Sequence, residues 1–358
     1  MRACQSDWAK RSVSVSPPNA LLGTIKRLTA GESPEPAELT AAFNVIWSGD
    51  ATPVLISALL IALRVKGETS LDLAAVVRSL RGAMVELPAE RPDDLVDTCG
   101  TGGGTINTFN ISTAAALLIA GVGVRVAKHG NRSFTTQCGS ADVLEALGVP
   151  IDAPVSVMQS ALRSAGIVFM FAPAMHPAMR HVGPIRRELG VQTVMNMVGP
   201  LANPAHAGRQ VVGVSDARRL PLIAGAMQAL DTVHTLVVHG DGMDEISPFR
   251  ESQVLEIRAG QISEWTIDPR KFGFGKGTPD QIAGGPPTDN AATVVRVLRG
   301  EANEPSTAAV VLNAAAALYV GGAVQTFGDG VSVANDAIRS GAGLVALDRL
   351  RRAFTSPS

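Results

Sequence analysis

The chain lacks the features that mark membrane, secreted and nucleic-acid-binding proteins. Its 358 residues carry a formal net charge of −1. Without a basic surplus, nucleic acid is not an expected partner. The longest apolar runs, TPVLISALLIALRV and TAAALLIAGVGV, are shorter than a membrane span. The three cysteines, Cys4, Cys99 and Cys138, are an odd number without metal-ligand spacing, which is typical of a reducing compartment.

The first 19 residues, MRACQSDWAKRSVSVSPPN, contain no apolar stretch of the kind found in a signal peptide. We therefore expect residues 1–19 to be a flexible tail and the protein to be soluble and cytoplasmic, with no membrane partner. What the sequence does have is an ordinary globular composition, 46% hydrophobic and 18% charged. A chain of this length is expected to form one large domain and one smaller domain.

Residues 20–90 predict a small all-helical domain. Thr52 before Pro53 is a typical helix start, and Thr69 with Asp72 forms a capping-box pattern at the start of the next helix. The helix containing VLISALLIAL is apolar nearly all round, so we expect it to be buried on more than one side. The domain is a candidate surface for dimerisation.

The remainder, residues 91–358, predicts an α/β domain. Short apolar runs alternate with helix-length segments, which favours a mainly parallel sheet flanked by helices. The predicted strands are residues 95–97, 122–127, 167–171, 211–214 and 235–238. The segment QVLEIRAGQISEWTI predicts a β-hairpin added to that sheet. Two late helices, TVVRVLRG and STAAVVLNAAAALYVGG, are expected to pack over it.

A glycine-rich loop follows the first predicted strand, in DTCGTGGGTINTFNIST. A glycine loop that leads into a helix offers backbone N–H groups and the positive end of the helix dipole to an anion. The loop is not a Walker A motif, and Thr105 replaces the third glycine of the Rossmann pattern. It is either a phosphate site or a tight structural turn. Ser112 and Thr113 either cap the helix or face a phosphate or a metal.

Two further loops follow later strands. KHGNRS supplies Lys128, His129 and Arg132. Ligand sites in open α/β sheets gather at the carboxyl ends of the strands, which favours a polyphosphate site over a solvated turn. HGDGMDEIS supplies Asp244 and Glu245, hard oxygen ligands suited to Mg²⁺ held together with phosphates. The alternative is a solvated acidic pair.

Residues 176–204 contain a group of arginines and the run GPLANP. Arg180, Arg186 and Arg187 are candidates to meet an acidic second substrate, or to form surface ion pairs with Glu188. GPLANP is a candidate wall for an aromatic pocket.

Taken in order, GTGG, TFNIST, KHGNRS, GSADVLEALG, PIRRELG, GPLANP and DGMDE resemble the anthranilate phosphoribosyltransferase family over nearly the whole chain from about residue 20. The resemblance implies transfer of a 5-phosphoribosyl group from phosphoribosyl pyrophosphate to the amine of anthranilate in tryptophan biosynthesis. It also implies Mg²⁺, a homodimer, and a helical domain joined by part of residues 176–204.

The resemblance also implies roles for particular residues. The catalytic set is Lys128, Arg132 and Arg186. Anthranilate would contact Gly100, Asn131 and Arg186. Metal would be held by Ser112, Asp244 and Glu245. Phosphoribosyl pyrophosphate would contact Gly100, Gly102, Gly103, Gly104, Thr108, Asn110, Ile111, Ser112, Thr113, Lys128, His129, Gly130, Asn131, Arg132, Ser133 and Ser140.

The chain departs from the family pattern at two places. Gly104 and Thr105 stand where the family usually has an aspartate and a glycine, which changes the glycine loop itself. Pro286 replaces a usual aspartate, and we expect it at the surface. For His129 we expect a structural hydrogen bond rather than proton transfer. Two alternative functions are a pyrimidine nucleoside phosphorylase-like enzyme and a non-catalytic nucleic-acid-binding relative.

Overall fold

The computed structural model describes residues 19–133 and 136–355. It begins with four helices: α1 (Asn19–Thr29), α2 (Pro36–Trp47), α3 (Pro53–Lys66) and α4 (Ser70–Arg81). The predicted helix starts are confirmed, because the Thr52 side chain accepts a hydrogen bond from the Leu55 N–H, and Thr69 and Asp72 form a capping box. Of the predicted tail, residues 1–18 lie outside the described residues, and Asn19 already belongs to α1.

Helix α3 differs from the prediction. Its buried side chains, Ile56, Leu59, Leu60 and Leu63, form one face only. On the outer side, Val54 and Val65 are 77% and 81% exposed. The expectation of burial on several sides is therefore wrong for the single chain, which leaves an apolar helix face in solvent.

The predicted parallel sheet and its hairpin are confirmed. The strands are β1 (Val96–Gly100), β2 (Val126–Gly130), β3 (Ile167–Phe171), β4 (Arg209–Gly213), β5 (His234–His239), β6 (Ser252–Arg258) and β7 (Gln261–Ile267). They lie in the order β3-β2-β1-β4-β5-β6-β7, with β1 to β5 parallel and the β6–β7 hairpin antiparallel. Strand β2 begins later than predicted, because the preceding helix runs to Gly121 and Gly123 turns the chain at φ 94°.

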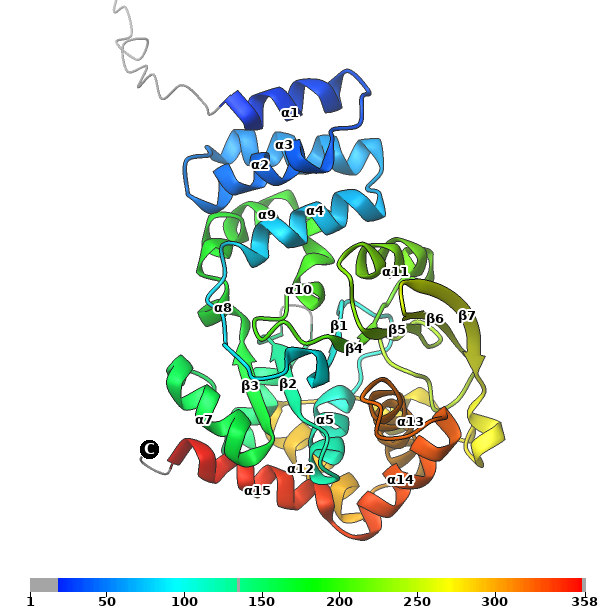
Figure 1. The fold of residues 1–358 in the computed structure, drawn as a ribbon. Coiled ribbons are helices and arrows are strands. Elements are labelled where there is room, and N and C mark those ends of the chain that lie inside the picture. The colour runs from blue at the N-terminus through cyan, green and yellow to red at the C-terminus, as the bar shows by residue number, and fades with distance from the viewer. Residues whose placement is uncertain (1–18, 134–135, 356–358) are drawn as a thin grey trace, which may run out of the picture.

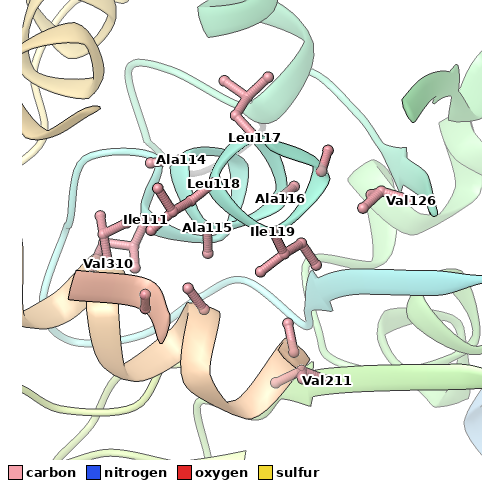
Figure 2. Packing of buried hydrophobic residues seen from close by; sticks show 14 of the residues in the cluster. Ile111, Ala114, Ala115, Ala116, Leu117, Leu118, Ile119, Val126, Val211 and Val310 are labelled. Atoms are coloured by element: carbon pink, nitrogen blue, oxygen red, sulfur yellow. The ribbon is translucent and has the colours of Figure 1, made fainter. Parts of the chain in front are cut away.

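Helices cover both faces of the sheet (Figure 1). Helices α5 (Ile111–Gly121) and α13 (Glu304–Val320) pack on one face, and α11 (Leu220–Ala229) packs on the other, against β5 and β6. Figure 2 shows Ile111 of α5 beside Val310 of α13 in the larger core.

The remaining helices complete the outer layers. α7 packs against β3, and α15 contacts α5 and α7. One late helix differs from the prediction: α12 contacts α5, α6 and α15 instead of lying on the sheet, because α5 and α13 already occupy that face. Pro286, just before α12, is exposed as expected. The bounds are α6 (Ser140–Ala146), α7 (Val155–Ala165), α12 (Pro287–Arg299), α14 (Phe327–Arg339) and α15 (Ala342–Thr355).

The segment between β3 and β4 leaves the sheet and returns to it. It contains α8 (Ala172–Met175), η3 (Pro177–His181), α9 (Gly183–Leu189), η4 (Val194–Asn196) and α10 (Val198–Leu201). α9 contacts α3, and α10 contacts α4, as their neighbouring positions in Figure 1 also show. One hydrophobic cluster contains residues of α1–α4, this segment, α11 and the facing side of the sheet, so the four helices are packed firmly onto the rest.

Short 3-10 turns complete the chain at η2 (Pro92–Asp94), η5 (Ala217–Arg219), η6 (Pro269–Phe272) and η7 (Pro279–Ile282). Within residues 19–133 and 136–355, no helix is both long and apolar enough to cross a membrane.

Candidate functional site

A cleft of about 460 Å³ lies at the carboxyl ends of β1, β2 and β4. The strand order reverses between β1 and β4, which is where ligands bind in open α/β sheets. The size is that of a small-molecule site. The cleft brings together the glycine loop, the KHGNRS loop, the carboxylate pair and the segment between β3 and β4.

All but one of the predicted site residues line this cleft. The lining includes Gly100, Gly102, Gly103, Gly104, Thr108, Asn110, Ser112, Thr113, Lys128, His129, Gly130, Asn131, Arg132, Ser133, Ser140, Arg186, Asp244 and Glu245. The exception is Ile111, whose side chain is fully buried in the core and whose N–H donates to the Phe109 carbonyl at 2.7 Å.

The glycine loop needs glycines for two physical reasons. Gly102 and Gly103 adopt φ of 69° and 76°, the left-handed region that side chains disfavour. A Cβ atom at Gly100 would overlap the Asp244 carboxylate. The Gly102 N–H donates to Asp244 Oδ2 at 2.7 Å, so the loop already presents its amides to an anionic oxygen. This contact shows that the N–H groups of the loop can donate hydrogen bonds to the oxygens of an anion.

The two residues that depart from the family pattern fix the loop to the segment that carries the carboxylates. The Thr105 N–H and hydroxyl both donate to the Gly242 carbonyl, at 3.0 and 3.4 Å. A Cβ atom at Gly104 would lie 2.7 Å from that same oxygen. The absence of a side chain at residue 104 is therefore what allows this close approach.

Lys128 crosses the floor of the cleft. Its side chain is buried, and its ammonium donates to the Thr98 carbonyl and to the Ser112 hydroxyl, the latter at 3.3 Å. Burial lowers the pKa of the Lys128 ammonium, and the negative charges of Asp97 and Glu245 offset only part of this shift. A cation beneath the helix start where the glycine loop ends is well placed to attract phosphate oxygens.

Asp244 and Glu245 are two adjacent carboxylates inside the protein. Burial raises the pKa of Asp244. Burial, with the charge of Asp244 added, raises the pKa of Glu245 to about 8, although Lys128 opposes this. Glu245 Oε1 accepts the Ser112 N–H at 3.1 Å. A bound cation would stabilise the charged form of these two buried carboxylates, and their hard oxygens suit Mg²⁺.

The protein oxygens at this point are too few to hold the ion alone. No cluster of three or more His, Cys, Asp or Glu ligands occurs within the part of the chain that the structure describes. Asp244, Glu245 and the Ser112 hydroxyl therefore fit an ion that keeps waters or takes ligand phosphates as its other ligands, as Mg²⁺ does.

His129 is neutral in this environment. Burial lowers its pKa well below the ordinary value, and the neighbouring His176 and Lys128 lower it further, while the Gly199 carbonyl opposes them. Its backbone N–H donates to Asp97 Oδ1 at 3.2 Å, and its ring lies 4.9 Å from that of His176. A ring with so low a pKa is a weak proton acceptor.

Arg132 stands at the rim of the cleft with its charge already paired. Its Nη1 lies 2.6 Å from Asp142 and 2.5 Å from Glu145, and its side chain is 47% exposed. Hydrogen bonds to these carboxylates raise its pKa. A phosphate would have to compete with two carboxylates for this guanidinium.

Arg186 differs from Arg132 in how its charge is surrounded. Its side chain lines the cleft from α9, and burial alone lowers its pKa. Within the described residues, no carboxylate pairs with it. An unpaired, half-buried guanidinium is suited to a carboxylate ligand. Arg180 and Arg187 do not line the cleft, so the structure does not place them to meet an acidic second substrate. Within the described residues they also form no ion pair with Glu188, which was the alternative. Gly199 and Pro200 of GPLANP line the cleft beside Arg186.

Among the lining residues that the sequence analysis missed are Ser215, Asp216 and Arg219. They follow β4, and Ser215 Oγ donates to the Gly102 carbonyl at 2.8 Å. The strand-end rule that selected the other loops would have selected SDARR as well, since it directly follows the predicted strand VVGV.

Comparisons with known proteins agree for both domains of the chain. The model of the glycosyl transferase family helical bundle domain matches residues 23–84, and that of the glycosyl transferase family a/b domain matches residues 92–344. An anthranilate phosphoribosyltransferase of Methanosarcina acetivorans is 45% identical over 332 residues, 93% of this chain and 89% of the relative.

Solved structures give the same result. An anthranilate phosphoribosyltransferase from Thermus thermophilus superposes with a TM-score of 0.88 at 39% identity, covering 93% of this chain and 99% of that one. The anthranilate phosphoribosyltransferase from Saccharomyces cerevisiae in complex with PRPP and Mg superposes with a TM-score of 0.86 at 27% identity, covering 94% and 98%.

Proposed function

The chain belongs to the anthranilate phosphoribosyltransferase family, and from that premise we propose how its cleft transfers the 5-phosphoribosyl group of phosphoribosyl pyrophosphate to the amine of anthranilate. The products are N-(5-phosphoribosyl)anthranilate and pyrophosphate, in tryptophan biosynthesis. One observation carries the assignment of the site: a glycine loop, a buried carboxylate pair and an unpaired arginine face one cleft.

The donor is assigned to the side of the cleft at β1 and β2. Amides of the glycine loop and the Ser112 and Thr113 end of α5 would hold the pyrophosphate, with Lys128 beneath them. Asp244, Glu245 and Ser112 would hold Mg²⁺, which when bound offsets negative charge on the diphosphate. A yeast relative was solved with PRPP and Mg. As the bond to the leaving group breaks, Lys128 offers fixed positive charge where negative charge develops.

The acceptor is assigned to the side formed by the segment between β3 and β4. Arg186 would hold the carboxylate of anthranilate, which turns the neighbouring amine toward the ribose, while Gly199 and Pro200 flank the ring. An aryl amine is nucleophilic as its free base, so orientation contributes more than proton abstraction. The low pKa of His129 agrees with this view.

We assign the dimer interface to the helical domain. The exposed face of α3, with Val54 and Val65, is the apolar surface that a second copy would cover. We also assign residues 20–90, with part of 176–204, to this domain and residues 91–358 to the α/β domain. We assign the protein to the cytoplasm. We expect neither nucleic-acid nor membrane partners.

The decisive experiment follows anthranilate fluorescence after mixing enzyme, phosphoribosyl pyrophosphate and a series of Mg²⁺ concentrations. The proposal expects decay that requires both the donor and the metal. Release of the free base from a pyrimidine nucleoside mixed with inorganic phosphate, with no decay of anthranilate fluorescence, would instead indicate phosphorolysis. An absence of decay at every Mg²⁺ concentration, from folded protein, would overturn the proposal.

A further inference from the structure

Arg219 is the third arginine that lines the cleft, after Arg132 and Arg186, and it comes from a different part of the chain than either. It ends η5, just after β4, and its side chain is only 13% exposed. Its guanidinium reaches across to the segment between β3 and β4, where it meets Gln192 and Met197. Arg186, Gln192 and Met197 all belong to this segment and line the cleft.

The hydrogen-bond partners of Arg219 are neutral, and its one carboxylate partner stands at the limit of an ion pair and is shared with Arg218. Nη2 donates to the Gln192 amide oxygen at 3.3 Å, and Nη1 lies 3.0 Å from the Met197 sulfur, a weak acceptor. The carboxylate beside it, Asp216, stands 4.0 Å from Nε. Arg218 already binds that carboxylate through two hydrogen bonds of 2.9 Å.

A largely buried cation that shares its one carboxylate with another arginine can accept a further anion as partner. Arg186 has no carboxylate partner among the described residues. One carboxylate carries a single negative charge, whereas Arg186 and Arg219 together carry two positive charges. The acceptor end therefore has more positive charge than one anthranilate carboxylate provides for.

We propose that Arg219 is a second anion-binding residue of the acceptor end, and that with Arg186 it gives the cleft affinity for aromatic amines that carry two carboxylates. This specificity rests on the acceptor site assigned above. Arg219 acts on the ligand and takes no part in bond making. The competing explanation is mechanical: Arg219 ties η5 to Gln192 and Met197 and contributes only to stability.

The test compares anthranilate with 2-aminoterephthalate, which is anthranilate with a second carboxylate across the ring. Binding of each ligand to the full-length protein is measured by calorimetry, and each is also tested in the fluorescence assay. The variants are Arg219→Gln, Arg219→Lys and, as a matched control, Arg187→Gln. Arg187 is an exposed arginine that does not line the cleft. Thermal unfolding of each variant shows whether it is folded.

We expect Arg219→Gln to weaken binding of 2-aminoterephthalate at least tenfold and that of anthranilate less than threefold. Arg219→Lys should recover part of the loss, and Arg187→Gln should bind both ligands as the wild type does. Equal weakening of both ligands with a lower melting temperature would establish the mechanical explanation and overturn the proposal. Wild-type protein that fails to bind the dicarboxylate would also overturn it.

These outcomes are separable from failure of the proposed function. If wild-type protein does not consume anthranilate, the reaction assigned above is wrong. Selective loss of dicarboxylate binding in Arg219→Gln would still establish the anion site in that case.

Discussion

Acidification should destabilise the protein through His176, a buried histidine behind the cleft. The side chain is 4% exposed, and burial lowers its pKa from 6.5 to about 4. As the pH falls through 6.5, His176 becomes protonated in the unfolded chain, whereas in the folded chain it becomes protonated only near pH 4. The stability present above pH 6.5 is therefore lost between these values. At about 1.4 kcal/mol per pKa unit, the full effect is about 3 kcal/mol, with about 2 kcal/mol lost by pH 5.

The measurement is urea unfolding at pH 7 and pH 5 for the wild type and for His176→Gln, whose amide does not titrate. The difference between the two proteins cancels the titration of groups that do not contact His176. Among these groups is Asp97, whose pKa burial raises to about 6 and which therefore favours the folded state on acidification. The variant should lose about 2 kcal/mol less than the wild type over this interval.

A control separates burial from the mere presence of a histidine. His206→Asn removes a side chain that is 42% exposed and pairs with Glu86, and it should leave the wild-type pH dependence in place. Equal pH dependence in the wild type and His176→Gln would refute the reasoning, because it would mean that His176 takes up its proton in the folded state as readily as in the unfolded chain.

Three further changes test other parts of the structure. Arg186→Ala should raise the KM for anthranilate at least tenfold and that for phosphoribosyl pyrophosphate less than threefold in steady-state kinetics, since a charge-assisted hydrogen bond is lost on one substrate only; equal effects would contradict the assignment. Gly213→Ala should lower kcat/KM at least tenfold, because its Cβ would overlap the Asp244 backbone; unchanged kinetics would show that the carboxylates tolerate displacement. Glu256→Gln should cost about 1–3 kcal/mol in urea unfolding followed by Trp265 fluorescence, because that carboxylate accepts hydrogen bonds from Trp265 and Tyr319; an unchanged midpoint would contradict this.

Much of the fold can be predicted from short sequence patterns that act within a few residues. Thr52 and Thr69 mark helix starts through interactions within one turn, and their neighbours suffice to predict them. The strands are short apolar runs, and the tendency of parallel strands to end at one edge brings together loops as distant as those of Lys128 and Asp244.

What escaped prediction depends on direction and on partners far away in the chain. Arg218 and Arg219 are identical neighbours in the sequence, yet one side chain is 90% exposed and the other 13%, because the turn of η5 points them apart. Which side chains of α3 are exposed depends on the face that the other helices cover. The hydrophobic content of α3 alone cannot predict that face. The contact of Thr105 with Gly242 depends on how closely two loops approach.

The hydrophobic cluster shared by α1–α4 has a consequence for the order in which the chain is made. The Ser70 hydroxyl donates to the Leu222 carbonyl, 152 residues later, and the Arg81 guanidinium donates to the Leu201 carbonyl, 120 residues later. The helices that leave the ribosome first must therefore wait for segments made much later before their inner face is closed. Until residue 257, the last buried member of the cluster, has been synthesised, the cluster is incomplete and the apolar face of the helices is open to a chaperone.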